Sequence, residues 1–257
     1  VRVRVMVEQD PREIRANKRV SKMLRHPNAL GKHFRRFDTL RWLGEDDLKP
    51  HMHAKIYAFS HPKPCVLIGS FNPSGDGIDD SPKIIRRIGD QDAGHNLLVE
   101  HRERKVVRAM RRHIFWLRFL DRPLFSRWVP GRQRVVASQQ VRVWFYPRPE
   151  PGAIESILDP LVEGQRLRVA MSHLKLGQGL QLLCDASNRG VEVQVIIHHS
   201  NRRAPREAED AIREAGATIV RYRHAAMLPM HAKFMLIDGG GERLSTYGSL
   251  NLNQRSL

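Results

Sequence analysis

The chain has 257 residues, of which 41% are hydrophobic and 28% charged, a balance typical of folded globular proteins rather than disordered ones. Its 44 Lys and Arg against 27 Asp and Glu give a formal net charge of +17, which favours a polyanionic partner, either nucleic acid or an anionic lipid surface, without choosing between them. Cys65 and Cys184 lie far apart, so neither a disulfide framework nor a cysteine-based zinc site is indicated.

The first half begins with an alternating segment, residues 1–7, whose period of two predicts a β-strand. The basic segment 12–41 predicts one or two amphipathic helices, and the apolar runs 56–59 and 65–68 predict strands. A helix is expected from about residue 100 to 120, with an arginine stripe that is either a solvated face or a contact with an anionic surface. Residues 121–140 contain Pro and Gly and predict a linker.

In the second half, strands are predicted at 141–146, 167–171, 191–197 and 234–237. Helices are predicted at about 154–161, 180–186 and 205–216, and Pro160 should kink or end the first. Strands that alternate with helices indicate an α/β fold with a mixed, largely parallel sheet.

The alternating segment 191–197 is similar to 1–7, which indicates two similar βα repeats. We expect a first half at 1–120, a linker at 121–140 and a second half at 141–257. Because only the second half has structure ahead of its alternating strand, we expect the chain to begin partway through its first repeat, with on the order of 50 residues absent, and to end before the second is complete.

One pair of motifs occurs in both halves: H-A-K ahead of an apolar run, then G-S-x-N. Residues i and i+2 of a strand point to the same face, so each copy can present an imidazole, an ammonium, a hydroxyl and a carboxamide together. Two facing sets would form a site suited to a phosphate diester, with no metal cage. The residues are His53, Lys55, Ser70 and Asn72 in the first copy, and His231, Lys233, Ser249 and Asn251 in the second.

These motifs resemble the signature of the phospholipase D superfamily, H-x-K-x4-D followed by G-S-x-N, usually present twice. The second copy matches fully, including Asp238, whereas Ser60 replaces the aspartate of the first copy. The resemblance implies that this aspartate supports the local structure and charge balance of the motif and does not attack, so we expect Ser60 to reduce the tuning of the site rather than abolish activity. The resemblance implies a pseudo-twofold pair of halves with the active site between them.

The resemblance also implies a two-step reaction without metal or cofactor, through a phosphohistidine. It favours His53 as the nucleophile and His231 as the general acid. Family members place a carboxylate or amide beyond each G-S-x-N to orient the histidines, and in the first half His95 or Asn96 is expected there.

Three functions remain open. The preferred one is a bacterial phospholipase D or a cardiolipin-synthase-like phosphatidyltransferase, acting on phospholipid at an anionic membrane surface as a monomer whose halves form an intrachain pseudo-dimer. A nuclease of the same superfamily is favoured by the charge, although the smallest such nucleases carry one motif and dimerise. The third is a non-catalytic anion-binding module, with Ser60 as a sign of decay.

Overall fold

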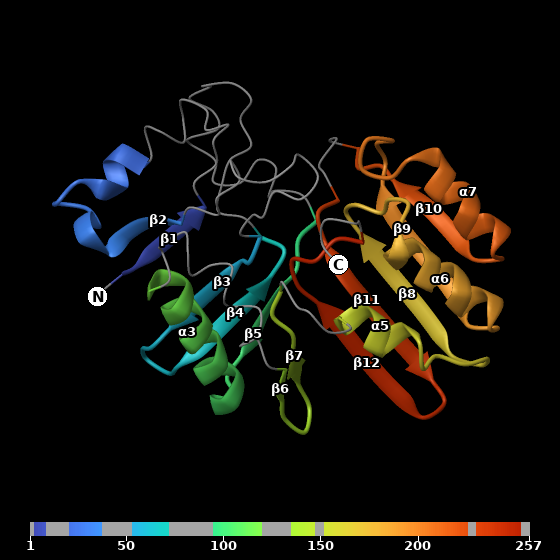
Figure 1. Ribbon diagram of the computed structural model, residues 1–257, viewed down its shortest axis with the longest axis horizontal. Coiled ribbons are helices and arrows are strands. Elements are labelled where there is room, and N and C mark those ends of the chain that lie inside the picture. The colour runs from blue at the N-terminus through green and yellow to red at the C-terminus, as the bar shows by residue number, and fades with distance from the viewer. Residues whose placement is uncertain are drawn as a thin grey trace.

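The computed structural model describes residues 3–8, 21–37, 53–71, 95–119, 135–146, 152–225 and 230–252. Figure 1 shows the elements of the first half on one side and those of the second half on the other, with β5 and β11 towards the middle. The fold is mixed α/β, as the sequence predicts, with several separate sheets.

The second half is built on a five-stranded sheet of order β10-β9-β8-β11-β12. Strands β8 (Arg166–Met171), β9 (Glu192–His198) and β10 (Thr218–Tyr222) are parallel, and β11 (Lys233–Gly239) pairs antiparallel with both β8 and β12 (Glu242–Tyr247). The carboxyl ends of the three parallel strands therefore meet the start of β11 at one edge of the sheet.

Helices α5 (Ala153–Leu158), α6 (Gln178–Asn188) and α7 (Arg206–Glu214) cover one face of this sheet (Figure 1). Inward-facing side chains of the strands, such as Leu167, Val195 and Ile197, pack with Leu183 and Ile212 of the helices, and all five are at most 2% exposed. Burying one such side chain stabilises the fold by about 2 kcal/mol, so this core holds the site edge rigid.

The first half has smaller sheets. Strands β3 (Ile56–Phe59), β4 (Cys65–Gly69) and β5 (Leu98–His101) form an antiparallel sheet, β1 (Val5–Glu8) pairs in parallel with β2 (Phe34–Phe37), and β6 (Val136–Ala137) pairs antiparallel with β7 (Arg142–Val143). The short 3-10 helix η1 (Gly31–His33) precedes β2. The long helix α3 (Arg104–Phe119) packs its buried valines and Met110 against Val66 and Val143.

Several predicted boundaries are wrong. The helix expected from residue 100 begins at Arg104, because residues 98–101 pair with β4 as β5. Residues 34–37 of the basic segment form β2 rather than helix, since they pair with β1. Residues 136–137, expected in the linker, form β6, and the strand expected at 141–146 is confined to β7. Other parts of the basic segment and of the linker lie outside the described residues.

The sheet is also less parallel than expected, because β11, β12 and the whole β3-β4-β5 sheet pair antiparallel. The two halves carry sheets of different size, so the pseudo-twofold pairing of two similar repeats and the domain boundaries stay predictions. No helix in the described part of the chain is long and apolar enough to cross a membrane.

Candidate active site

The second motif copy lies at the carboxyl edge of the five-stranded sheet, where ligands commonly bind in parallel sheets. Lys233 opens β11 and is 2% exposed, and its Nζ donates to the backbone oxygen of His231 at 2.6 Å. After β12, the Gly248 amide donates to the Lys233 carbonyl at 3.3 Å, and the half-buried Ser249 leads to Asn251, which is 7% exposed. The Asn251 Oδ1 atom is buried and has no hydrogen-bond partner among the described residues, so it could accept a hydrogen bond from a bound molecule.

The first copy repeats the local geometry at the start of β3. Lys55 is 9% exposed, and its Nζ donates to the backbone oxygen of His53 at 2.8 Å, the same bond that Lys233 makes to His231. Ser70 is 1% exposed. It follows the last residue of β4 rather than lying on a strand, and Ser249 and Asn251 likewise follow β12, so the expected strand spacing of G-S-x-N is wrong. Asn72 lies outside the described residues.

A chain of hydrogen bonds joins the two copies. The Leu97 amide donates to Ser70 Oγ at 3.0 Å, and Ser70 Oγ donates to Asn96 Oδ1 at 3.0 Å. Asn96 Oδ1 lies 3.0 Å from Nδ1 of His231, which belongs to the other half. We call Ser70, Asn96 and His231 the relay. Through it, the serine of the first motif positions the histidine of the second.

The relay fixes the protonation of the His231 ring. A carboxamide oxygen only accepts hydrogen bonds, so Nδ1 of His231 must carry a proton to donate to Asn96 Oδ1. In the neutral imidazole, Nε2 then holds the lone pair. A histidine held in this tautomer can attack an electrophile through Nε2.

The electrostatic surroundings keep that imidazole neutral. Burial first, and then the charges of Lys233, Lys55 and Arg203, lower the pKa of His231 to about 3. Lys55 of the first copy is one of these charges, so it lies near the histidine of the second. At neutral pH the free site presents an unprotonated His231 among cations.

Gly69 permits the close approach on which the relay depends. A Cβ at this position would lie 1.8 Å from the backbone oxygen of Leu97, a clash with backbone that no rotamer change can relieve. The absence of a side chain lets the end of β4 lie against the start of β5, where Ser70 N donates to Leu97 O at 2.9 Å. For the matching Gly248 of the second copy, no atom of the described residues lies within 4 Å of the place that a Cβ would take.

Of the two candidates for orienting the histidine, Asn96 makes the contact with the ring. His95 supports the same region through its backbone oxygen, which accepts from the amide of His231 at 3.1 Å. The exposed His95 ring lies 2.8 Å from the hydroxyl of Tyr222 and packs edge-on against its ring. A further contact between the halves is a hydrogen bond between Tyr247 and His101.

The sequence did not identify His173 and Arg203 as site residues. Lys233 pairs with Met171 across β11 and β8, and Ser172 N donates to Ala232 O at 3.1 Å. Continuing that register puts His173 opposite His231 on the neighbouring chain segment. Ser172 Oγ lies 3.1 Å from His173 Nδ1 and accepts from Arg203 Nη1 at 3.3 Å.

The charges around His173 resemble those around His231. Burial, and then Arg203, Lys233 and Lys175, lower the pKa of His173 to about 3. The sequence signal that could have identified His173 is its position. Ser172 and His173 directly follow the parallel strand β8, and the carboxyl ends of parallel strands commonly form binding sites.

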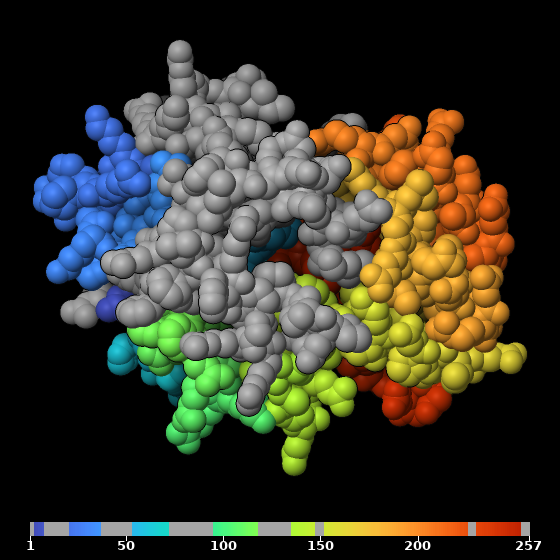
Figure 2. Space-filling model, in the orientation of Figure 1, coloured from blue at the N-terminus to red at the C-terminus, as the bar shows by residue number. Residues whose placement is uncertain are grey.

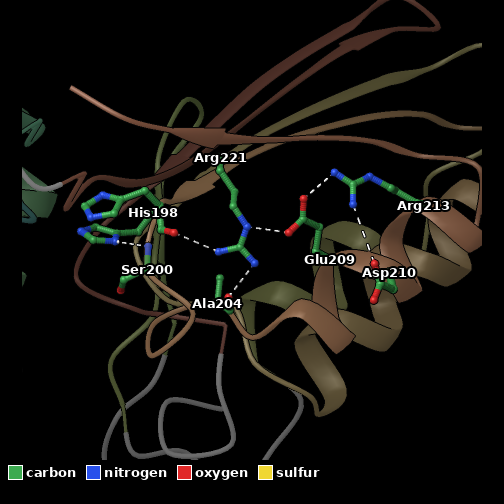
Figure 3. A network of polar contacts seen from close by, with 8 residues as sticks. His198, Ser200, Ala204, Glu209, Asp210, Arg213 and Arg221 are labelled. Carbon is green, nitrogen blue, oxygen red and sulfur yellow. Dashed lines mark hydrogen bonds and ion pairs between the residues drawn. The ribbon is translucent and has the colours of Figure 1, made fainter. Parts of the chain in front are cut away.

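Arg221 anchors the loop that carries Arg203. It donates from Nε to Glu209 Oε2 at 2.5 Å, and through its other nitrogens to the carbonyls of His199 at 3.1 Å and Ala204 at 3.0 Å (Figure 3). Burial works to raise the pKa of Glu209, but hydrogen bonds and charges of Arg221 and Arg213 outweigh it and lower the pKa. This network fixes both ends of the loop between β9 and α7.

Asp238 and Ser60 lie away from these side chains. Asp238 Oδ2 pairs with Arg168 Nη1 at 2.7 Å, and its Oδ1 lies 3.9 Å from Arg166 Nη1, on the face of β11 opposite to Lys233. Ser60 is exposed just beyond β3. Within the described residues, no group of three or more His, Cys, Asp or Glu is placed to hold a metal ion.

Residues 162–257 match a family model described as cardiolipin synthase, PLD-like domain. Among solved structures, polyphosphate kinase from Porphyromonas gingivalis is similar, with a TM-score of 0.50 and 14% sequence identity over 96% of this chain. The match spans 36% of that kinase, and at this identity it concerns the fold alone. A comparison with curated protein sequences gives no significant match.

The family model covers the second motif copy in full, and the solved structure has a phospholipase D superfamily fold. At the level of the superfamily, a PLD-like domain at residues 162–257 suggests a phosphodiesterase or phosphotransferase type of reaction for that domain. The PLD-like domain match at residues 162–257 and the similar fold together support the phospholipase D superfamily.

Proposed function

We propose that the chain is a phosphodiesterase or phosphatidyltransferase that acts on phospholipids through a phosphohistidine, with His231 as the nucleophile. The relay supports this role, because it leaves the lone pair on Nε2. The lowered pKa supports it as well, since a group with a pKa of about 3 is unprotonated at neutral pH. Both observations favour the reverse of the roles expected from the sequence.

In the first step, Nε2 of His231 attacks phosphorus and forms a P–N bond, while the bond from phosphorus to the leaving oxygen breaks. His53, protonated, gives its proton to that oxygen. Lys55 and Lys233 stabilise the negative non-bridging oxygens, an effect worth several kcal/mol in a preorganised site. The ring of His231 becomes positively charged, and the hydrogen bond from Nδ1 to Asn96 is strengthened.

In the second step, water or an alcohol attacks phosphorus and passes its proton to His53. The P–N bond breaks, and the electron pair returns to Nε2 of His231. Water gives a hydrolase and a lipid alcohol gives a phosphatidyltransferase. The proton stays on Nδ1 of His231 and is donated to Asn96 Oδ1 throughout, so one tautomer serves both steps.

The leaving group distinguishes the two histidine roles. A nitrophenolate leaves without protonation, so His53→Ala should keep most of its activity on bis(p-nitrophenyl) phosphate and lose activity on an alkyl diester. His231→Ala should lose activity on both substrates, and an acid-labile, base-stable phosphoryl adduct should form on His231 in the His53→Ala variant. An adduct on His53, or rescue of His231→Ala by the nitrophenyl diester, would reverse the assignment.

A substrate panel tests the chemical class. Phosphatidylcholine, phosphatidylglycerol and plasmid DNA are incubated with the protein in the presence of a chelator. Release of headgroup or formation of cardiolipin supports the proposal, nicking of the plasmid supports the nuclease favoured by the net charge of +17, and binding without turnover supports the anion-binding module. Loss of activity with chelator would contradict a metal-independent reaction.

A further inference from the structure

Helix α3 has one face made of cations. Its exposed side chains include Arg104, Lys105, Arg108, Arg111 and Arg112, and the helix contains no Asp or Glu. At 100° per residue, these positions fall within an arc of about 120°. Within the described residues, no carboxylate pairs with any of the five.

Two large aromatic side chains extend the same face. Phe115 is 55% exposed and Trp116 is 36% exposed, and their rings lie 5.7 Å apart at an interplanar angle of 73°. On the helical wheel they fall within or next to the cationic arc, widening it to about 140°. We call the five cations with Phe115 and Trp116 the α3 face.

The opposite side of the helix is committed to the core. Val106, Val107 and Met110 are at most 5% exposed, and His113 stacks on Phe145 with ring centroids 4.2 Å apart. Burial lowers the pKa of His113 to about 4, so the buried side carries no charge at neutral pH. The helix is therefore fixed with its α3 face outward. Figure 2 shows the green part of the chain, which includes α3, at the molecular surface.

We infer that the α3 face docks the protein on an anionic lipid surface. Cations beside exposed aromatic rings at one end of a surface helix are the composition of interfacial helices, in which the aromatics enter the boundary of headgroups and acyl chains while the cations neutralise lipid phosphates. A nucleic-acid surface is less well matched, because the two rings cross edge-to-face instead of offering parallel platforms on which successive bases could stack.

This docking does not depend on the reaction proposed above, because none of the seven residues belongs to the relay or to either motif. It would hold the protein at the membrane whichever anionic or neutral lipid the active site takes. The cations and the aromatic rings contribute to the binding free energy in different ways: the cations by their charge and the rings by the apolar area that they bury. The two parts of the face can therefore be tested separately.

The experiment measures sedimentation of the His231→Ala chain with phosphatidylcholine vesicles, with and without phosphatidylglycerol. The chain with an unaltered α3 should bind only the vesicles that contain phosphatidylglycerol, and its binding should weaken as the salt concentration is raised. Replacing Arg108, Arg111 and Arg112 by Gln should weaken partitioning about 100-fold. The matched control replaces Arg142, Arg206 and Arg243, which are exposed on other elements, with the same loss of net charge and a change of only a few fold.

Trp116 reports insertion directly. Its fluorescence, taken as the difference between the chain and its Trp116→Phe variant, should shift to shorter wavelength with anionic vesicles. Equal weakening in the two triple variants, no vesicle binding, or a Trp116 signal that responds to an oligonucleotide but not to vesicles would each overturn the inference. Vesicle binding without lipid turnover by the wild type would leave it standing and count against the proposed reaction instead.

Discussion

Substitution of Asn96 by alanine tests the relay most directly. Its Oδ1 atom accepts two hydrogen bonds, from Ser70 Oγ and from His231 Nδ1, each 3.0 Å long. The alanine variant removes both and leaves the imidazole free to rotate and to change tautomer. The proton can then move to Nε2, and a His231 ring in that form has no lone pair directed at phosphorus.

The expected magnitudes differ for folding and for catalysis. Two neutral hydrogen bonds contribute about 2 kcal/mol to stability, at about 1 kcal/mol each. For turnover, groups that orient a functional imidazole through its second nitrogen are worth roughly 10–100-fold. We expect kcat/KM to fall about 100-fold in Asn96→Ala, which corresponds to about 2.7 kcal/mol of transition-state stabilisation.

Asn96→Asp is the matched control. Its carboxylate still accepts from Ser70 and from His231, and its negative charge raises the pKa of the ring. This variant should therefore keep turnover at alkaline pH and show its acid limb at higher pH than the wild type. A purely structural role for Asn96 would not move that limb.

Initial rates on a soluble diester across pH, together with nitrogen NMR of labelled histidine, give both readouts. The wild-type spectrum should place the His231 proton on Nδ1. Turnover of Asn96→Ala within about threefold of wild type, or a proton found on Nε2, would refute the reasoning, since about 100-fold is expected.

The remaining predictions concern the scaffold. Gly69→Ala should lower turnover as strongly as Asn96→Ala, because its Cβ would overlap backbone of the facing strand; turnover like wild type would contradict this. Arg221→Leu should cost about 3 kcal/mol in urea unfolding, because it removes one partner of the buried Glu209, and a loss below about 1 kcal/mol would count against it. The pKa values of His231 and His113 fall from 6.5 to about 3 and about 4, so stability should be complete above the unfolded pKa and decline as pH falls, by about 2 kcal/mol per ring at about pH 5. Melting temperatures across pH measure this, and His113→Leu, which cannot titrate, should flatten the slope.

Elements specified by their own residues were predictable. The helices α5, α6 and α7 follow from apolar spacing and from breakers such as Pro160 and Gly216, and all three lie where expected. Strand β5 was missed because four residues carry too little periodicity, and its pairing with β4 decides its structure. The same holds for β2, whose partner β1 is distant in sequence.

The site residues also separate into those that local sequence predicts and those that only distant contacts place. His231, Lys233 and Lys55 could be named from the motif spacing, and Asn96 was one of two candidates. His173 could not be named, because it lies 58 positions before His231 and only the antiparallel register of β8 with β11 brings the two together. Arg203 is placed by a loop whose ends are held by Arg221, a relation that no local pattern carries.

The position of Asp238 explains why the first copy can differ from the signature. Lys233 and Asp238 are five residues apart on one strand, so they point to opposite faces, and the aspartate pairs with Arg168 on the neighbouring strand β8. Its side chain is 37% exposed, and exposed ion pairs of this kind contribute about 1 kcal/mol or less. Ser60 lies just beyond β3, and among the described strands β3 has β4 as its neighbour but none at the place that β8 holds beside β11. The serine therefore replaces a charge whose partner belongs to the sheet rather than to the reaction, which weakens the case for a decayed, non-catalytic module.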